Sequence, residues 1–259
     1  MERIFKDQMN RTVRLEGIPR RIVSLVPSQT ELLYDLGLQD EVVGITKFCI
    51  YPDEWYRKKQ RVGGTKQLNV DAIRQLCPDL IIGNKEENTK EDIQALEAIA
   101  PVWMSDIYTF DDALKMIEQL GEMIGKDEVA EELILDIQQN FELINIPSKS
   151  RSFLYFIWKD PDFIVGQHTF VNSLLSKIGF HNLCEENRYP QWRETEMQPD
   201  CVFLSSEPYP FTQEHIKLYQ KRFPTSKIRI INGEMCSWYG SRMKLAPAYF
   251  NSLIKELDL

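Results

Sequence analysis

The chain has 259 residues, of which 43% are hydrophobic and 27% charged, and it carries a formal net charge of -8 at pH 7. This composition is typical of a globular protein with two modest lobes or one large domain, and it excludes extensive disorder. The acidic balance and the absence of a Lys/Arg cluster argue against nucleic acid or an anionic membrane as the partner.

The N-terminal segment and the cysteines bear on location. The chain as written opens without an apolar leader, and no apolar run approaches the roughly 18 residues that span a bilayer. We therefore expect a cytoplasmic protein, or an exported protein whose leader was removed. The five cysteines include no CxxC pair, and their odd number favours a reducing compartment. Cys77 and Cys201 have apolar neighbours, so both are expected to be small buried side chains.

Residues 1–108 are predicted to form an N-terminal α/β lobe. Residues 5–15 alternate in polarity around a polar centre, which predicts a hairpin. After it, short apolar runs typical of parallel strands alternate with segments of helical pattern. The predicted strands are 21–26, 41–47, 78–84 and 102–105, and the predicted helices are 28–37, 69–75 and 89–98. Ser28 and Glu31 have the spacing of a capping box at the start of the first helix.

Residues 109–147 are predicted to be a helical linker between two lobes. From about 127 to 144, apolar residues recur every three or four positions, which predicts an amphipathic helix. These residues are Val129, Leu133, Ile137, Phe141 and Ile144. Roughly 18 residues at 1.5 Å rise would span about 27 Å, enough to connect two compact lobes. A backbone helix flexes less than loop crossovers, so the lobes are expected to open and close only slightly.

Residues 148–259 repeat the pattern of the first lobe. A strand at 152–158, a helix at 169–178 and a strand at 228–231 follow in similar order. The segment 199–205 opens with Pro-Asp, as does the third strand of the first lobe. An internal repeat of about a hundred residues predicts two similar lobes. The predicted fold class is α/β, with two similar lobes, each a mainly parallel sheet flanked by helices. A long backbone helix joins them, and a ligand cleft lies between the lobes at the carboxyl ends of the strands.

The sequence carries no recognisable catalytic signature. It contains no nucleophile elbow, phosphate-binding loop, dinucleotide fingerprint or HExxH zinc motif. The three histidines lack metal-ligand spacing, so we predict no catalytic residue, no metal site and no cofactor of the protein's own. His168 precedes a helix in a predicted cleft loop and could contact a ligand or an open metal position, although a solvated or capping histidine is the alternative.

Aromatic side chains gather in the segments that follow the predicted strands, where they would line the cleft. The first lobe contributes Phe48, Tyr51 and Trp55, and the second contributes Trp158, Phe163, Tyr189, Trp192, Trp238 and Tyr239. Flat side chains with a polar tip suit a large planar or bulky ligand. Core packing is the alternative for each of them.

Charged residues near the same strand ends suggest two further roles. Arg193 and Arg242 could pair with carboxylates or phosphates of a ligand, with salt bridges to protein acids as the alternative. Acidic residues could dock a basic partner, although solvated loops explain them equally well. These residues are Glu86, Glu87 and Glu91 in the first lobe and Glu194, Glu196 and Glu207 in the second.

Several motifs together resemble one family. They are RRIVSLVPSQTELL at 20–33, VGGT at 62–65, NVDAI at 69–73 and PDLII at 78–82, with weaker matches NSLL at 172–175 and YGSR at 239–242. Over nearly the whole chain, this pattern resembles the helical-backbone substrate-binding proteins of ABC importers for vitamin B12, haem and ferric siderophores. Among these proteins the chain looks most similar to the cobalamin binders.

The resemblance implies a two-lobed binding protein without catalysis that carries a corrinoid such as cobalamin. Asn84 stands where a ligand-stacking tryptophan is expected. The ligand set that the loops and the resemblance predict together is Phe48, Tyr51, Asn84, His168, Tyr189, Trp192, Trp238, Tyr239 and Arg242. Haem or a ferric siderophore is the alternative ligand. An intracellular relative that binds a metal cofactor, or an enzyme acting on one, is the alternative class.

The resemblance also implies an ABC permease as the partner if the protein is exported. Docking would use Glu86, Glu87 and Glu91 with Glu194 or Glu196, and which of the last two is used stays open. A delivery protein works outside the cytoplasmic membrane, so a periplasmic or cell-surface location is expected if a leader was removed. The predicted cleft works in one chain, which suits a monomer. Catecholate siderophore complexes are strongly anionic and would need several arginines in the cleft. The sequence places only Arg193 and Arg242 near the cleft loops, which favours a corrinoid.

Overall fold

The computed structural model describes residues 2–193 and 196–258, and its chain divides into two compact units. Unit 1 comprises Met1–Ile107, Asp111–Ile137 and Tyr239–Arg242, and unit 2 comprises Tyr108–Phe110, Gln138–Trp238 and Met243–Leu259. The sequence placed residues 239–242 in the C-terminal lobe, whereas the structure assigns them to unit 1. The cleft between two lobes stays a prediction.

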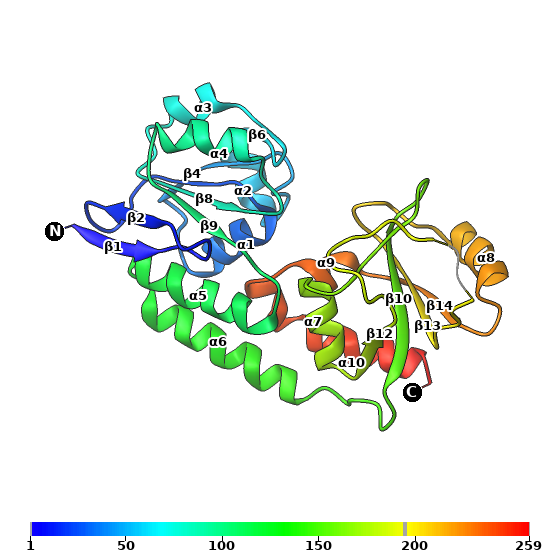
Figure 1. Cartoon of the computed structure of the whole chain (residues 1–259). Helices are drawn as coiled ribbons and strands as arrows, with labels where there is room; N and C mark the ends of the chain where they lie inside the picture. The colour runs from blue at the N-terminus through cyan, green and yellow to red at the C-terminus, as the bar shows by residue number, and fades with distance from the viewer. Residues whose placement is uncertain (1, 194–195, 259) are drawn as a thin grey trace. The chain divides into compact units, whose positions relative to one another are not determined.

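Unit 1 is built on a parallel sheet with the strand order β5–β4–β3–β8–β9 (Figure 1). The strands are β3 (Ile22–Ser24), β4 (Val42–Ile45), β5 (Gln60–Arg61), β8 (Leu80–Asn84) and β9 (Val102–Ser105). Every residue of β8 is buried, because helices cover both faces of a parallel sheet. Ile73 of α3 and Ile93 of α4 pack on the face that carries Val23 and Ile81.

The helices of unit 1 follow from local signals in the sequence. They are α1 (Pro27–Asp35), α2 (Asp53–Lys58), α3 (Val70–Gln75), α4 (Lys90–Glu97), most of α5 (Phe110–Ile124) and the first part of α6 (Asp127–Glu142). Asn69 and Thr89 cap α3 and α4, since each side chain accepts a hydrogen bond from a first-turn amide. Gly37, with a φ of 81°, follows α1 in the left-handed conformation that glycine favours.

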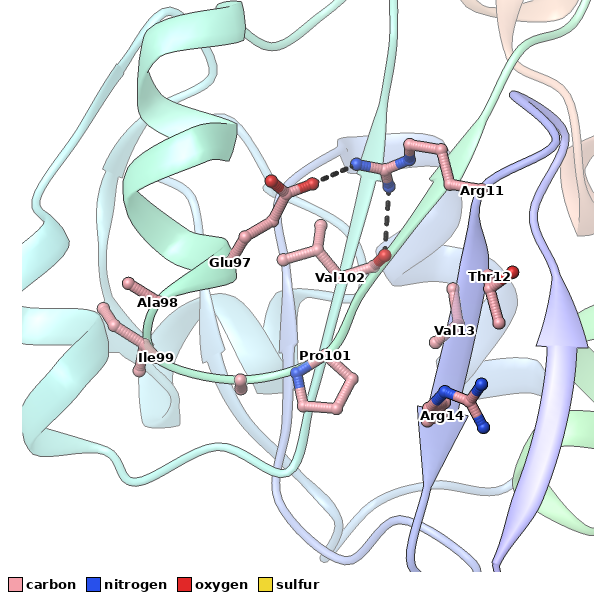
Figure 2. Close-up of a pocket in the computed structure, with 10 residues that line it drawn as sticks. Arg11, Thr12, Val13, Arg14, Glu97, Ala98, Ile99, Pro101 and Val102 are labelled. Carbon is pink, nitrogen blue, oxygen red and sulfur yellow. Dashed lines mark hydrogen bonds and ion pairs between the residues drawn. The ribbon is translucent and has the colours of Figure 1, made fainter.

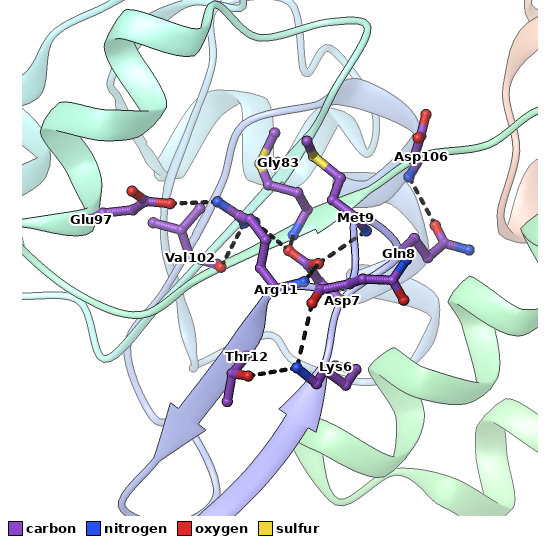
Figure 3. Close-up of polar contacts among 12 residues, drawn as sticks. Lys6, Asp7, Gln8, Met9, Arg11, Thr12, Gly83, Glu97, Val102 and Asp106 are labelled. Carbon is purple, nitrogen blue, oxygen red and sulfur yellow. Dashed lines mark hydrogen bonds and ion pairs between the residues drawn. The ribbon is translucent and has the colours of Figure 1, made fainter.

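An N-terminal hairpin of β1 (Arg3–Lys6) and β2 (Thr12–Leu15) covers the outer edge of β9 (Figure 3). Asp7, which is buried, accepts hydrogen bonds from its own turn and from the Met104 amide of β9 at 3.3 Å. Gln8 donates its amide to the Met104 carbonyl at 3.2 Å, and Arg11 donates to the Val102 carbonyl at 3.0 Å. These bonds satisfy an edge that would otherwise invite pairing with another chain.

Unit 2 repeats the arrangement with a sheet in the order β11–β10–β13–β14, and β12 also pairs with β10. The strands are β10 (Arg151–Trp158), β11 (Phe163–Ile164), β12 (Phe180–Asn182), β13 (Cys201–Ser205) and β14 (Lys227–Ile231). The strand β11 alone runs antiparallel to β10, and β12, β13 and β14 are paired in parallel. Tyr219 and Phe223 at the end of α8 (Gln213–Arg222) pack on the face of the sheet that carries Phe156.

Three further helices of unit 2 follow strands that have already been described. One follows β11, and the other two follow β14. They are α7 (Phe170–Lys177), α9 (Gly233–Ser237) and α10 (Ala246–Glu256), and a 3-10 turn η1 (Ser241–Lys244) spans the boundary with unit 1. Figure 1 shows α7 and α10 on the side of the sheet away from α8. Both units are thus α/β with mainly parallel sheets flanked by helices, which confirms the predicted fold class.

Two local predictions are wrong. Ser28 and Glu31 do not form a capping box, because α1 begins at Pro27 behind Val26, whose side chain makes no cap. Glu31 pairs instead with Arg242, 211 residues away. Cys77 is exposed in the turn after α3, where it adopts a left-handed conformation, whereas Cys201 is buried in β13 as predicted.

The repeated Pro-Asp pair marks a structural device found in both sheets. The Asp79 carboxylate accepts hydrogen bonds from the amides of Arg20 and Arg21 at 2.7 and 2.8 Å. In unit 2 the Asp200 carboxylate accepts from the amide and the hydroxyl of Ser152, both at 2.8 Å. Each aspartate therefore ties the start of one strand to the start of its neighbour.

This device gives a pH-dependent prediction for Asp200→Asn. The amide of Ser152, followed by its hydroxyl and Arg151, holds the pKa of Asp200 below its usual value. The carboxylate therefore stabilises the fold above the unfolded pKa of about 3.9, and this contribution is lost as the pH falls through the lower folded pKa. We expect Asp200→Asn to lower the free energy of unfolding by about 1 kcal/mol at pH 7, since the group is partly exposed.

Denaturant unfolding at pH 7 and at pH 2 checks this prediction. The difference in the free energy of unfolding between wild type and Asp200→Asn should narrow towards pH 2, because the carboxyl becomes protonated as the pH falls. The matched control is Asp258→Asn, because that side chain is 91% exposed and lies 3.9 Å from its lysine partner. An equal difference in the free energy of unfolding at both pH values would show that the charge of the Asp200 carboxylate does not stabilise the fold.

Candidate functional site

The loop after β4 presents two exposed aromatic rings at the carboxyl end of the unit 1 sheet. Phe48 is 51% exposed and Tyr51 is 40% exposed, although both are large hydrophobic residues. A cation lies over each ring, with Lys47 Nζ at 5.1 Å from the Phe48 centroid and Arg242 Cζ at 4.5 Å from that of Tyr51. The two rings are thus held by polar groups rather than by core packing, which leaves ring surface open to a ligand.

Asn84, also at the carboxyl end of this sheet, lies inside the protein. Only 2% of the residue is exposed. Its amide group donates to Ser105 Oγ at 2.9 Å, and its carbonyl oxygen accepts from the amides of Glu86 and Glu87 at 2.8 and 3.0 Å. The side chain therefore shapes the loop after β8 and does not face outward as a ligand-stacking residue would.

Residues 239–242 return to unit 1 and pack on α1. Tyr239 is buried, and burial raises the pKa of its phenol well above the usual value, with a further increase from the nearby charge of Glu87. Arg242, only 7% exposed, donates to both carboxylate oxygens of Glu31. Of the two roles considered for Arg242, the structure shows the ion pair with a protein acid.

The acidic residues predicted to dock a partner lie on the surface where the structure describes them. Glu86 is half-buried, and Glu87, Glu91 and Glu196 are exposed. Glu194 lies outside the described residues. Glu91 sits in the first turn of α4, where a carboxylate is stabilised by the helix dipole.

In unit 2, Trp238 follows α9 and is held by a carboxylate. Its indole nitrogen donates to Glu207 Oε1 at 3.0 Å, and the Ser237 hydroxyl donates to the same oxygen at 3.1 Å. Gly233 allows this approach, since a Cβ there would lie 2.4 Å from Glu207 Cγ. Glu207, which the sequence grouped with the surface acids, therefore orients a half-buried tryptophan.

The segment around Tyr189 forms a second aromatic group of unit 2. The guanidinium of Arg188 lies 5.0 Å from the Tyr108 ring and 5.9 Å from the Tyr189 ring. Arg188 also donates to the carbonyl of His168 at 3.3 Å, and the His168 side chain is exposed. The sequence analysis missed Arg188, although an arginine directly before a loop tyrosine is a signal for such stacking.

Trp192 belongs largely to the core of unit 2. Its ring lies 5.8 Å from that of Phe156 and 6.1 Å from that of Phe223. The alternative considered for this residue, core packing, therefore describes its contacts. Trp55 in unit 1 is likewise only 2% exposed.

A groove of about 440 Å³ lies elsewhere on unit 1, between β2 and the segment that leads from α4 into β9 (Figure 2). Arg11 reaches across it to Glu97 and to the Val102 carbonyl, and Arg14 lies near its other end. The groove adjoins the amino end of β9, whereas ligands of such sheets bind beyond the carboxyl ends. None of the predicted site residues lines it.

The buried thiols are not poised for chemistry. All five cysteines lie in the described residues and are free, and Cys49, Cys184, Cys201 and Cys236 are buried. Burial raises the pKa of the Cys201 thiol to about 11 and also raises the pKa of Cys49. A thiol with a raised pKa stays protonated near neutral pH and is a poor nucleophile.

Comparison with known families identifies the class of protein. The family model described as periplasmic binding protein matches residues 22–194. The chain belongs to the periplasmic binding protein family. Members of this family are substrate-binding components of ABC importers and not enzymes, which confirms the prediction that the chain is not catalytic.

Two curated relatives match long parts of this periplasmic binding protein. The ABC transporter substrate-binding lipoprotein YvrC of Bacillus subtilis is 32% identical over 211 residues, covering 76% of this chain and 67% of the relative. The vitamin B12-binding protein of Pectobacterium atrosepticum is 26% identical over 261 residues, covering 94% of this chain and 91% of the relative.

Solved structures share the fold of this periplasmic binding protein. The vitamin B12-binding protein BtuF of Vibrio cholerae has a TM-score of 0.75 at 21% identity, covering 93% of this chain and 98% of that one. Structures described as heme-binding and siderophore-binding proteins match it with similar scores. At this identity the likeness shows the fold alone. In the described part of the chain, no helix is long and apolar enough to cross a membrane.

The contact between Glu207 and Trp238 gives a testable prediction for this periplasmic binding protein. Glu207→Leu removes the hydrogen-bond acceptor for the Trp238 indole and for the Ser237 hydroxyl. We therefore expect the free energy of unfolding to fall by about 2 kcal/mol. The tryptophan emission should also shift as Trp238 reorients. Glu207→Gln keeps an acceptor and should lose less than half as much.

Denaturant unfolding followed by intrinsic fluorescence measures both effects. Glu214→Gln, at an exposed position in the first turn of α8, is the matched control and should change neither. Unchanged emission in Glu207→Leu would show that Glu207 does not set the orientation of Trp238.

Proposed function

We propose that this periplasmic binding protein captures a metal chelate for delivery to an ABC permease, and that this chelate is a corrinoid such as cobalamin. The observation that carries the proposal is the exposed pair Phe48 and Tyr51 at the carboxyl end of the unit 1 sheet. Two exposed aromatic rings in one loop offer apolar surface that a large flat ligand can cover by stacking.

The charge of the described loops supports a corrinoid over a catecholate siderophore. Arg242 is committed to Glu31, and Arg188 lies over two tyrosine rings. Of the two arginines that the sequence predicted to meet an anionic ligand, this leaves the exposed Arg193, which is fewer guanidinium groups than a strongly anionic chelate would need. The rim of a corrinoid carries mostly amides, which single polar side chains can hydrogen-bond. The named vitamin B12-binding relatives, matched over almost their whole length, support the same choice.

In unit 1 the proposal assigns Phe48 and Tyr51 to the ligand. In unit 2, Trp238 and Tyr189 stay predicted ligand residues. His168 is retained because its side chain is exposed beside Arg188. The other predicted ligand residues would support the site indirectly, through the packing and hydrogen bonds described above, without touching the ligand. They are Asn84, Tyr239, Trp192 and Arg242.

Partner docking is proposed through the exposed acids. Glu87 and Glu91 in unit 1, and Glu196 in unit 2, would meet basic residues of a permease. Delivery to a permease places the protein outside the cytoplasmic membrane, as expected of a relative of a substrate-binding lipoprotein.

A parallel titration tests the ligand. Purified protein is titrated with cyanocobalamin, haemin and a ferric catecholate, following visible absorption and tryptophan fluorescence. Saturable one-to-one binding of the corrinoid, at least tenfold tighter than of the other two, is the expected result. If haemin bound more tightly, haem would replace the corrinoid as the proposed ligand. If none of the three bound, the proposed ligand class would be wrong, while the family assignment would stand.

A further inference from the structure

Arg242 is held in one orientation by a forked ion pair. Its Nε donates to Glu31 Oε2 at 2.8 Å, and its terminal nitrogen donates to Oε1 at 2.6 Å. The side chains are 7% and 17% exposed, so the pair is largely shielded from water. A two-point contact fixes the plane of the guanidinium, which a lysine ammonium cannot reproduce.

The main chain around Arg242 is equally constrained. Gly240 has a φ of 102°, a conformation that favours glycine. A Cβ at this position would lie 3.3 Å from Leu32 Cβ and 3.4 Å from the Ser28 carbonyl oxygen of α1. The preceding residue, Tyr239, is buried. Residues 239–242 therefore sit closely on α1, and the guanidinium projects from a fixed base.

This fixed guanidinium meets a side chain of the proposed ligand site. Its Cζ lies 4.5 Å from the centroid of the Tyr51 ring. Tyr51 is in a segment without helix or strand, between Phe48 and α2. The guanidinium lies over the ring, and 40% of the Tyr51 residue is exposed.

We propose that Arg242 is a positioning residue, which, oriented by Glu31, holds the Tyr51 ring in place for ligand stacking. The inference rests on the proposed function and deepens it. It replaces the direct anion contact first considered for Arg242 by an indirect role. The two residues that hold the Tyr51 ring are therefore distant in sequence: Glu31 is 20 residues before Tyr51, and Arg242 is 191 residues after it.

Unit 2 offers a matched control for the general effect of losing such an arginine. Arg222 pairs with Asp162 at 2.6 Å and lies 4.8 Å from the Tyr219 ring and 5.8 Å from the Phe223 ring. It shares the ion pair and the ring contact, and the partners Asp162, Tyr219 and Phe223 do not belong to the proposed ligand set. Arg222→Gln should therefore lower the melting temperature without changing ligand affinity.

The experiment combines a ligand-free readout with a double-mutant cycle. In the ligand-free protein, hydrogen exchange of residues 47–52 should become at least tenfold faster in Arg242→Gln, and remain near wild type in Arg222→Gln. Cyanocobalamin affinity should fall about fivefold in Arg242→Gln, the size expected for one cation–π contact. Arg242→Lys should recover only part of this loss.

The cycle separates positioning from a purely structural role. In a Tyr51→Ala background, Arg242→Gln should cause no further loss of affinity, because the ring that it positions is gone. Additive losses, or unchanged exchange of residues 47–52, would overturn the proposal. If the wild type bound none of the three chelates, the proposed function would fail, while the exchange experiment would still decide whether Arg242 holds this loop.

Discussion

The double variant Phe48→Ala, Tyr51→Ala is expected to bind cyanocobalamin about a hundredfold more weakly than wild type and to melt at nearly the same temperature. Each exposed ring should contribute about 1.4 kcal/mol through burial against the ligand and stacking. Two such contributions correspond to about a hundredfold in affinity. Stability should change little, because the rings are 51% and 40% exposed and leave no large cavity when removed.

The control for this prediction is another exposed ring of unit 1 with a cation over it. Tyr56 on α2 is 37% exposed, and Arg61 Cζ lies 4.4 Å from its ring centroid. Tyr56→Ala changes the same chemistry outside the loop that follows β4. If it weakened binding as much as the double variant does, or if the double variant bound like wild type, the site would not be at Phe48 and Tyr51.

The longer strands of both sheets could be predicted from the sequence because their signal is local, whereas the short strands β5, β11 and β12 were not predicted. Runs such as 80–84 and 201–205 are buried at every position, as strands covered on both faces must be. The helix caps at Asn69, Thr89 and Thr169 are also local, since each side chain bonds an amide three residues on. Residue type and spacing specify these features without knowledge of the fold.

The helices α8, α9 and α10 of unit 2 went unpredicted, and the two longer ones, α8 and α10, went unpredicted for different reasons. The helix α8 shows little amphipathic pattern, since Tyr219 is its buried residue and much of its length is polar. The helix α10 does carry apolar residues at helical spacing, with Phe250, Leu253 and Ile254 buried. The sequence of α10 therefore does carry a local helical signal.

The candidate site depended on distant contacts, which sequence spacing does not reveal. The nearest partner for Glu31 by spacing is Ser28, but a buried guanidinium 211 residues away binds it instead. The aromatic residues show the same limit. Phe48 and Trp55 lie seven residues apart, yet one is 51% exposed and the other 2%, because only Trp55 is on the inner side of a helix.

Gly166→Ala is expected to cause the largest loss of stability. A Cβ on this residue would lie 2.1 Å from the Glu186 carbonyl oxygen and 3.1 Å from that of Arg188. Both are main-chain atoms, so no side-chain rotation can relieve the contact. Alanine must separate two segments joined by three hydrogen bonds of 2.7 Å. We expect about 3 kcal/mol of destabilisation, or a melting temperature lower by roughly 6 to 12 °C.

The same substitution should also weaken ligand binding, because the displaced segment carries Arg188 and Tyr189. Thermal unfolding and the cyanocobalamin titration measure the two effects. Gly17→Ala is the matched control, since a Cβ there would meet no heavy atom within 4 Å beyond its own chain neighbours, and its stability should stay within about 0.5 kcal/mol of wild type. If Gly166→Ala melted like Gly17→Ala, the two segments could separate freely. The close approach at Gly166 would then not be what fixes the loop that presents Tyr189.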